Sequence, residues 1–225
     1  MATRLIIDGE TGEQRREEVP AEELEELRLM GERHAAMQKL MARSASEAAL
    51  NDPDVMRTWG ELHSLWDDIE QWLYIGFDSL LKEDHSTTRA IFYSQRTHAG
   101  RRGMLEEVMA SFHFASLDEL KPLKAAIKRV KARSDFRNKI THGFWGWFED
   151  GASGTVELVR MTAEPHLSPD KVQKFTLHDL RRERDSMRST LEALAEAVKP
   201  FQEAKWARWS AELHARLHED HAQSN

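Results

Sequence analysis

Apolar residues recur at helical spacing over most of this chain. The longest regular stripe follows Asn51-Asp52-Pro53, where hydrophobic residues return at steps of four and three. Its members are Val55, Trp59, Leu62, Trp66, Ile69, Leu73, Phe77 and Leu80. Such spacing keeps the side chains on one face of an α-helix, so it predicts a long helix with that face in the core. We interpret the tryptophans on this helix, which include Trp72, as core residues without a chemical role.

The same pattern predicts four more helices, over residues 20–42, 86–112, 116–142 and 177 to about 215. The first begins at Pro20 with an acidic first turn, and the third begins with a capping box made by Ser116 and Glu119. Gly143 follows the third helix and is expected to take the left-handed conformation that ends many helices. Pro200 should kink or divide the last helix.

Three segments have the composition of β-strands. Residues 3–8, the turn at 9–12 and the polar residues after it predict a small hairpin. Residues 155–161 and 171–176 predict a hairpin or two edge strands, separated by Pro165 and Pro169. The expected fold is therefore mainly α, an up-and-down helical bundle over residues 51–225 with a two-stranded β insertion at about 153–177. Residues 1–50 form an appendage of hairpin and acidic helix.

Composition limits the possible environments and partners. Cysteine is absent, which excludes disulfides and thiolate metal sites and favours a reducing cytoplasm. Neither a signal peptide nor an apolar run long enough to span a bilayer is predicted. The net charge of -7 hides an asymmetry, because residues 8–26 carry -7 whereas residues 121–142 carry +7. The basic segment could bind phosphates, or it could be a solvated helix face.

The basic helix ends in Arg137-Asn138-Lys139-Ile140-Thr141-His142. Histidine carries protons at neutral pH, and arginine is a permanent cation with a planar set of donors for phosphate oxygens. These groups are what metal-free phosphodiester cleavage requires. The spacing of Arg and His also occurs at Arg216 and His221, but only the first copy has Asn directly after the Arg.

Arg-Asn-x-x-x-His at the end of a helix, late in an all-helical domain, resembles the signature of the HEPN superfamily (higher eukaryote and prokaryote nucleotide-binding domains). The close match covers residues 134–147, and the helices from about residue 54 agree in general pattern. Many HEPN proteins are metal-independent endoribonucleases of toxin–antitoxin, phage-defence and CRISPR systems, and others are scaffolds or nucleotide binders. The resemblance implies an endoribonuclease without cofactors, a homodimer that acts on RNA, and an antitoxin or other regulatory partner.

The expected catalytic residues are Arg137, Asn138 and His142. On an α-helix Asn138 and His142 share a face, whereas Arg137 lies about 140° away from His142. Either the helix loosens at its end or two copies of the motif meet, and the resemblance favours two copies across a two-fold axis. Asp135 is a possible supporting residue that could hold Arg137 or His142 in place. The structural alternative is that Arg137 pairs with Asp135 and His142 only caps the helix.

Further candidates surround the motif. Arg96 and Arg101, from a polar stretch containing two glycines, could support the site or belong to a kinked, solvated helix. The candidate nucleic-acid-binding residues are Lys128, Lys131, Arg133, Lys139 and Trp145, although the aromatic cluster at 144–148 could instead be core or dimer interface. We expect no metal site. Histidines His214, His218 and His221 and the pair His63 and Asp67 have suitable spacing, but lack converging ligands.

Two functions therefore remain open from the sequence. The first is a homodimeric, metal-independent endoribonuclease. The second is a non-catalytic interaction or nucleotide-binding module that keeps the helical fold and binds another protein through its acidic N-terminus and tryptophans.

Overall fold

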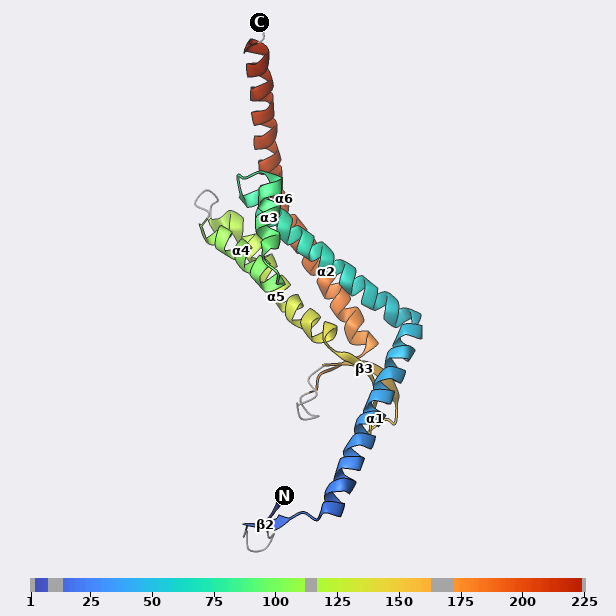
Figure 1. The fold of residues 1–225 in the computed structure, drawn as a ribbon. Helices are drawn as coiled ribbons and strands as arrows, with labels where there is room; N and C mark the ends of the chain where they lie inside the picture. Colours follow the sequence, from blue (N-terminus) through green and yellow to red (C-terminus); the bar gives the residue numbers. More distant parts are fainter. Residues whose placement is uncertain (1–2, 8–13, 112–116, 163–171, 224–225) are drawn as a thin grey trace.

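The computed structural model describes residues 3–7, 14–111, 117–162 and 172–223, and it is mainly helical (Figure 1). In chain order the elements are β1 (Thr3–Ile7), β2 (Gln14–Glu18), α1 (Ala21–Asn51), α2 (Pro53–Leu80), α3 (His85–Ser94), α4 (His98–Ser111), α5 (Leu117–Thr141), β3 (Phe144–Glu149), β4 (Val156–Met161), β5 (Lys174–Phe175) and α6 (Leu177–Gln223). Strands β1 and β2 form the predicted antiparallel hairpin, whose turn lies outside the described residues. No described helix is both long and apolar enough to cross a membrane.

The core forms where α2 packs along α6, with α4 and α5 against the same side of the bundle. The predicted α2 stripe is confirmed, because all of its members are buried except Trp59, which is partly exposed and packs against the core. Helix α6 contributes Leu180, Met187, Leu194 and Val198, and α5 contributes Leu120, Leu123, Ile127, Val130 and Ile140. The hydrophobic periodicity thus corresponds to the observed core.

Helix α1 is longer than predicted and ends at Asn51, not at residue 42. Ala45 and Ala49 near its end are fully buried, and this part of α1 contacts β3 and α2. The boundary predicted at residue 50 therefore divides a segment that belongs to the body. Asp52 then separates α1 from α2, where its Oδ1 accepts hydrogen bonds from the backbone N–H groups of Asp54 and Val55.

The single helix predicted over residues 86–112 is wrong, because two helices, α3 and α4, meet at Gln95–Thr97. Thr97 stabilises the start of α4, where its hydroxyl accepts a hydrogen bond from the N–H of Gly100 at 3.1 Å. The Thr97 cap thus favours the start of a new helix over one continuous helix through the polar stretch that contains Arg96 and Arg101. Phe112 and the capping residue Ser116 lie outside the described residues.

The β insertion has three strands, not two, in the antiparallel order β3-β4-β5. Strand β3 contains the aromatic cluster after the motif, and it pairs along its whole length with β4, from Phe144 opposite Met161 to Glu149 opposite Val156. Segments 155–161 and 171–176 correspond to β4 and to the two-residue β5. The region with Pro165 and Pro169 is outside the described residues.

Gly143 joins α5 to β3, but it does not have the left-handed conformation predicted for it. Among the described residues, Gly154 has the only positive φ. Glycine is required at 143 for another reason, since a Cβ there would lie 2.2 Å from the backbone oxygen of Met161 and 3.2 Å from that of Lys139. The close approach of β4 to the end of α5 leaves no room for a side chain.

Gly143→Ala should therefore lower the free energy of unfolding by about 3 kcal/mol, because the backbone must shift to admit the methyl group. Gly151→Ala is the matched control, since a Cβ at that position meets nothing within 4 Å. We expect the control to change stability by less than about 1 kcal/mol. Chemical denaturation followed by circular dichroism measures both values, and equal stability of the two variants would contradict the packing argument.

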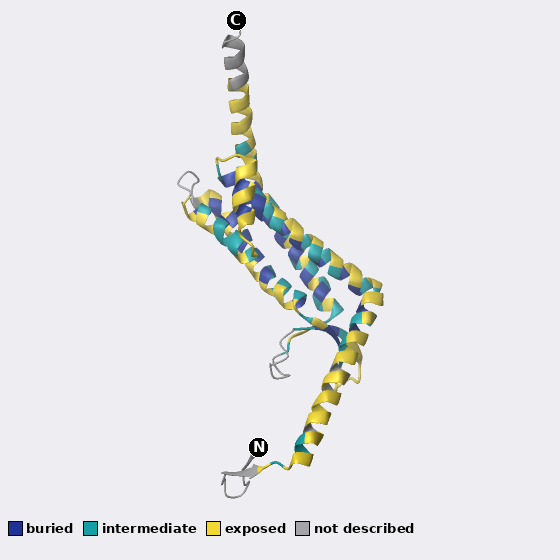
Figure 2. Ribbon diagram, in the orientation of Figure 1, coloured by how far each residue is buried: buried dark blue, intermediate teal, exposed yellow. Residues whose placement is uncertain are grey.

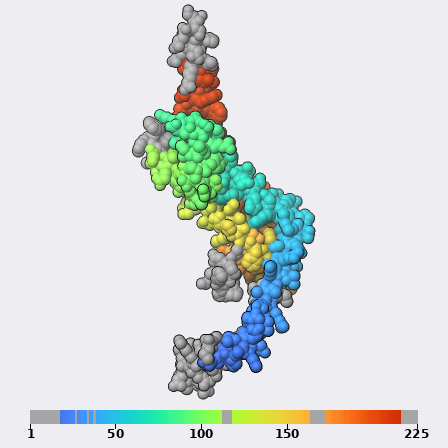
Figure 3. All heavy atoms as spheres, in the orientation of Figure 1, coloured from blue at the N-terminus to red at the C-terminus, as the bar shows by residue number. Residues whose placement is uncertain are grey.

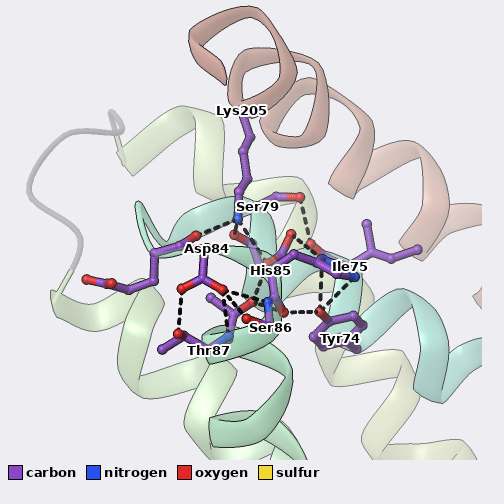
Figure 4. A network of polar contacts seen from close by, with 11 residues as sticks. Tyr74, Ile75, Ser79, Asp84, His85, Ser86, Thr87 and Lys205 are labelled. Carbon is purple, nitrogen blue, oxygen red and sulfur yellow. Dashed lines mark hydrogen bonds and ion pairs between the residues drawn. The ribbon is translucent and has the colours of Figure 1, made fainter. Parts of the chain in front are cut away.

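Helix α6 continues past Pro200 without a break in its helical assignment and reaches Gln223, beyond the predicted end. A polar network attaches it to the junction of α2 and α3 (Figure 4). Lys205 Nζ donates hydrogen bonds to the carbonyls of Asp78 and Glu83 at 2.8 and 3.2 Å and lies 2.9 Å from the carboxylate of Asp78. Tyr74 contacts His85 in the same network.

Both ends of the molecule extend away from the body (Figure 3). Most described side chains of residues 21–43 in α1, and those of residues 206–215 in α6, are exposed (Figure 2). Large apolar side chains lie on these extensions. On α1 they are Leu29, Met30, Leu40 and Met41, and on α6 they are Trp206, Trp209 and Leu213.

Candidate functional site

The motif lies at the C-terminal end of α5, which the body holds firmly. Helix α5 ends at Thr141, one residue before the predicted end, and Ile140 is buried in the core beneath it. Arg160 of β4 closes this end, where its Nε donates to the carbonyl of Ile140 at 2.8 Å and its Nη2 to that of Thr141 at 3.2 Å. The last carbonyls of a helix need such donors.

Arg160 is itself buried, at 9% exposed, between aromatic residues. Its guanidinium carbon lies 5.0 Å from the ring centre of Trp59 and 5.4 Å from that of Trp145. Burial lowers the pKa of Arg160 to about 10, so the side chain still carries its charge at neutral pH. No local sequence pattern identifies Arg160, because only strand pairing brings β4 to the end of α5.

Arg137 is partly buried and faces α2. Its guanidinium carbon lies 5.9 Å from the ring centre of Trp66, and its Nη1 is 3.4 Å from the side-chain oxygen of Asn138. Its Nε is buried without a hydrogen-bond partner. Within the described residues no carboxylate forms an ion pair with Arg137, so the alternative pairing with Asp135 is not present. The cation is held in place without being neutralised.

His142 and Asn138 are both exposed. The backbone N–H of His142 donates to the carbonyl of Asn138 at 3.2 Å, but Arg160, not the imidazole, covers the helix end. In the part of the chain described, no hydrogen bond or ion pair joins Arg137 to His142, and none joins either residue to Asp135. Within this chain the two ends of the motif are therefore not joined, in agreement with their 140° separation on a helix.

His63 of α2 is a further histidine at this site. It is partly buried, its ring lies 4.8 Å from that of Trp59, and it is one helical turn from Trp66. Burial, and then the positive charges of Arg137 and Arg160, lower the pKa of His63 although Asp67 opposes them. By its spacing in the sequence His63 is a candidate metal ligand with Asp67, but the described residues contain no cluster that could hold a metal ion.

Arg101, a predicted supporting residue, joins a partly buried polar cluster between α2 and α4. Its Nη2 lies 2.9 Å from the carboxylate of Glu70, which also accepts from Trp66 Nε1 at 3.2 Å and lies 3.3 Å from His98 Nδ1. Burial would raise the pKa of Glu70, but His98 and Arg101 outweigh it and lower that pKa. This cluster fixes the ring of Trp66 that Arg137 covers, whereas Arg96 is exposed and does not join it.

The residues predicted to bind nucleic acid divide into two groups. Lys128, Lys131 and Lys139 are exposed along α5. Arg133 instead forms an ion pair with the largely buried Glu183 at 2.6 Å, and it ties α5 to α6. The prediction for Trp145 is wrong, because this residue is buried, at 9% exposed, against Trp59 and Arg160 and cannot stack on a base.

A surface groove of about 750 Å³ runs between α5 and α6, and none of the motif residues lines it. Its basic residues are Arg129, Arg133, His178, Arg181 and Arg182. Carboxylates engage three of the arginines, which are Arg133, Arg181 and Arg182. Basic side chains thus lie both at the motif and in this separate groove.

No family model, no curated protein and no solved structure matches this chain.

Proposed function

We propose that this chain is a metal-independent endoribonuclease whose active site is completed in a homodimer. The HEPN-like motif supplies the catalytic residues, with Arg137 neutralising charge on the phosphate, His142 transferring a proton and Asn138 assisting either of them. The reaction is attack of a ribose 2'-hydroxyl on the adjacent phosphorus. Such chemistry needs a fixed cation and proton carriers, and no metal ion.

The main support for the proposal is the environment of the Arg137 side chain. Arg133, on the same helix, is neutralised by Glu183. Arg137 lies against Trp66 with a buried Nε that has no partner, and no described carboxylate neutralises it. A preorganised cation with free donors is suited to a phosphate oxygen.

Two features support a homodimer. His142 is exposed and has no contact with Arg137 in the same chain, so a second copy could bring the two together. The extensions of α1 and α6 also leave large apolar side chains uncovered, and exposed apolar patches commonly mark interfaces. The biological role that follows from the resemblance is a toxin or phage-defence nuclease in the cytoplasm, restrained by an antitoxin or regulatory protein.

A specific observation also favours a second function, that of a protein-interaction module without catalysis. Trp206 and Trp209 are 60% and 55% exposed on the extension of α6 and lie edge to face, with Leu213 beside them. Exposed tryptophans are typical anchors of protein interfaces. Cleavage activity separates the two functions, since an interaction module should bind a partner without cutting RNA.

His142→Ala should lower RNA cleavage in EDTA by about 100-fold or more, because one proton transfer is lost. His214→Ala, a substitution of an exposed histidine on α6, is the matched control and should cleave like the wild type. A fluorophore–quencher RNA of random sequence reports the rates without knowledge of the natural target. If wild type and His142→Ala give the same rate, the catalytic role of His142 is refuted.

A further inference from the structure

One ridge of α2 faces the C-terminal end of α5, where the motif lies. Trp59, His63 and Trp66 lie within about 60° of one another on this helix, since they follow at steps of four and three. The ridge meets two arginines from elsewhere in the chain, Arg160 at Trp59 and Arg137 at Trp66. His63 therefore lies between the two points at which cations are held against α2.

The C-terminal end of α5 runs along the same part of α2. Arg137 contacts Trp66, and four residues later Thr141 presents its carbonyl to Arg160, which contacts Trp59. Steps of four residues keep Arg137 and Thr141 on one face of α5. Both residues have a buried polar atom without a hydrogen-bond partner, the Nε of Arg137 and the Oγ1 of Thr141. Buried polar groups are normally satisfied, so water or a bound ligand can supply the missing partners here.

We propose that His63 is a further catalytic residue, the general base that acts beside Arg137 in the same protomer. This inference rests on the proposed ribonuclease function and assigns the second proton carrier of its site. His63 provides what His142 cannot provide within one chain, an imidazole held next to the phosphate-binding cation. The partner subunit's His142 then remains available for the opposite proton transfer.

A ring nitrogen of His63 takes the proton of the 2'-hydroxyl while O2' forms a bond to phosphorus and the bond from phosphorus to O5' breaks. Protonated His142 gives its proton to O5'. The products are a 2',3'-cyclic phosphate and a 5'-hydroxyl, and water then restores both histidines by proton exchange. Arg137 neutralises the non-bridging oxygens throughout.

The charges around His63 suit a base. Arg137 from α5 and Arg160 from β4 disfavour its protonated form, and Asp67 on its own helix favours it. Burial acts in the same direction as the arginines, so the pKa of His63 is lowered and the neutral imidazole persists to lower pH than that of an exposed histidine. Removal of the Asp67 charge should lower this pKa further.

The test uses the full-length chain and the random-sequence fluorophore–quencher RNA in EDTA. His63→Gln keeps a polar side chain of similar size but cannot take a proton, so kcat/KM should fall by about 100-fold or more. The Kd of His63→Gln for an RNA with a 2'-deoxy residue at the cleavage position should stay within about twofold of the wild-type Kd, because the base acts after binding. The melting temperature of the variant shows that the fold is retained.

The pH profile distinguishes a base from a packing residue. Asp67→Asn should shift the acid limb of kcat/KM to lower pH, whereas Asp68→Asn, on the other side of α2, should leave it in place. The inference is overturned if His63→Gln cleaves within about threefold of wild type while His142→Ala does not, or if Asp67→Asn leaves the acid limb unmoved. Absence of cleavage by the wild type would instead refute the ribonuclease function itself.

Discussion

Replacement of Arg137 by alanine is expected to reduce metal-free RNA cleavage by about 100- to 1,000-fold, the loss typical when a fixed donor to a developing charge is removed. Lys139, the other cation of the motif, is exposed and has no contact with Trp66 among the described residues. The protein should remain folded, because Arg137 forms no ion pair with a described residue and gives up its contact with Trp66, worth about 1 kcal/mol, and a long, exposed hydrogen bond to Asn138. Arg137→Lys should recover part of the rate, since lysine restores the charge but not the planar donors.

Arg129→Ala is the matched control for this experiment. Arg129 lies two turns earlier on α5, is exposed and lines the separate groove. Its loss should weaken RNA binding modestly, with a rate at saturating RNA close to that of the wild type. If Arg137→Ala and Arg129→Ala lose the same amount of activity, α5 contributes only general positive charge and the assignment of Arg137 fails.

The second large effect is expected at Arg160. Arg160→Met should lower the free energy of unfolding by about 3 kcal/mol or more, because two carbonyls at the end of α5 lose charged donors in a buried place. The contacts with Trp59 and Trp145 change as well. Cleavage should fall even where the variant is folded, since the end of α5 positions the motif.

Urea denaturation of Arg160→Met measures the stability change, and Arg188→Met is the control. Arg188 is exposed on α6 and reaches only Asp185, at 3.9 Å, so its replacement should cost less than about 1 kcal/mol. Wild-type stability of Arg160→Met would mean that the end of α5 does not depend on β4.

Elements with a strong hydrophobic period could be predicted from the sequence. The stripe of α2 and the repeats of α5 and α6 determine those helices, because each buries one continuous face. The break between α3 and α4 was missed, because a single threonine cap at Thr97 decides it. Strand β3 was missed because its aromatic residues suggested core or interface, and their strand conformation depends on pairing with β4.

The candidate site likewise combines residues of one short sequence motif with residues from distant parts of the chain. Arg137, Asn138 and His142 were found because they form one short motif, and the separation of Arg137 from His142 follows from helix geometry. Arg160 and His63 lie in other elements, and only the packing of β4 and α2 against α5 brings them close. The burial of Trp145 likewise depends on the sheet register, which places it opposite Arg160.

The chemical identity of the RNA ends is the most direct test of the central claim that Arg137 and the nearby histidines cleave RNA without metal. Products made by the wild type in EDTA should carry 2',3'-cyclic phosphates and 5'-hydroxyls, and an otherwise identical substrate with 2'-deoxy sugars should stay intact. Mass spectrometry identifies both ends. Intact RNA after incubation with the wild type, or cleavage of the deoxy substrate at an equal rate, would contradict the mechanism.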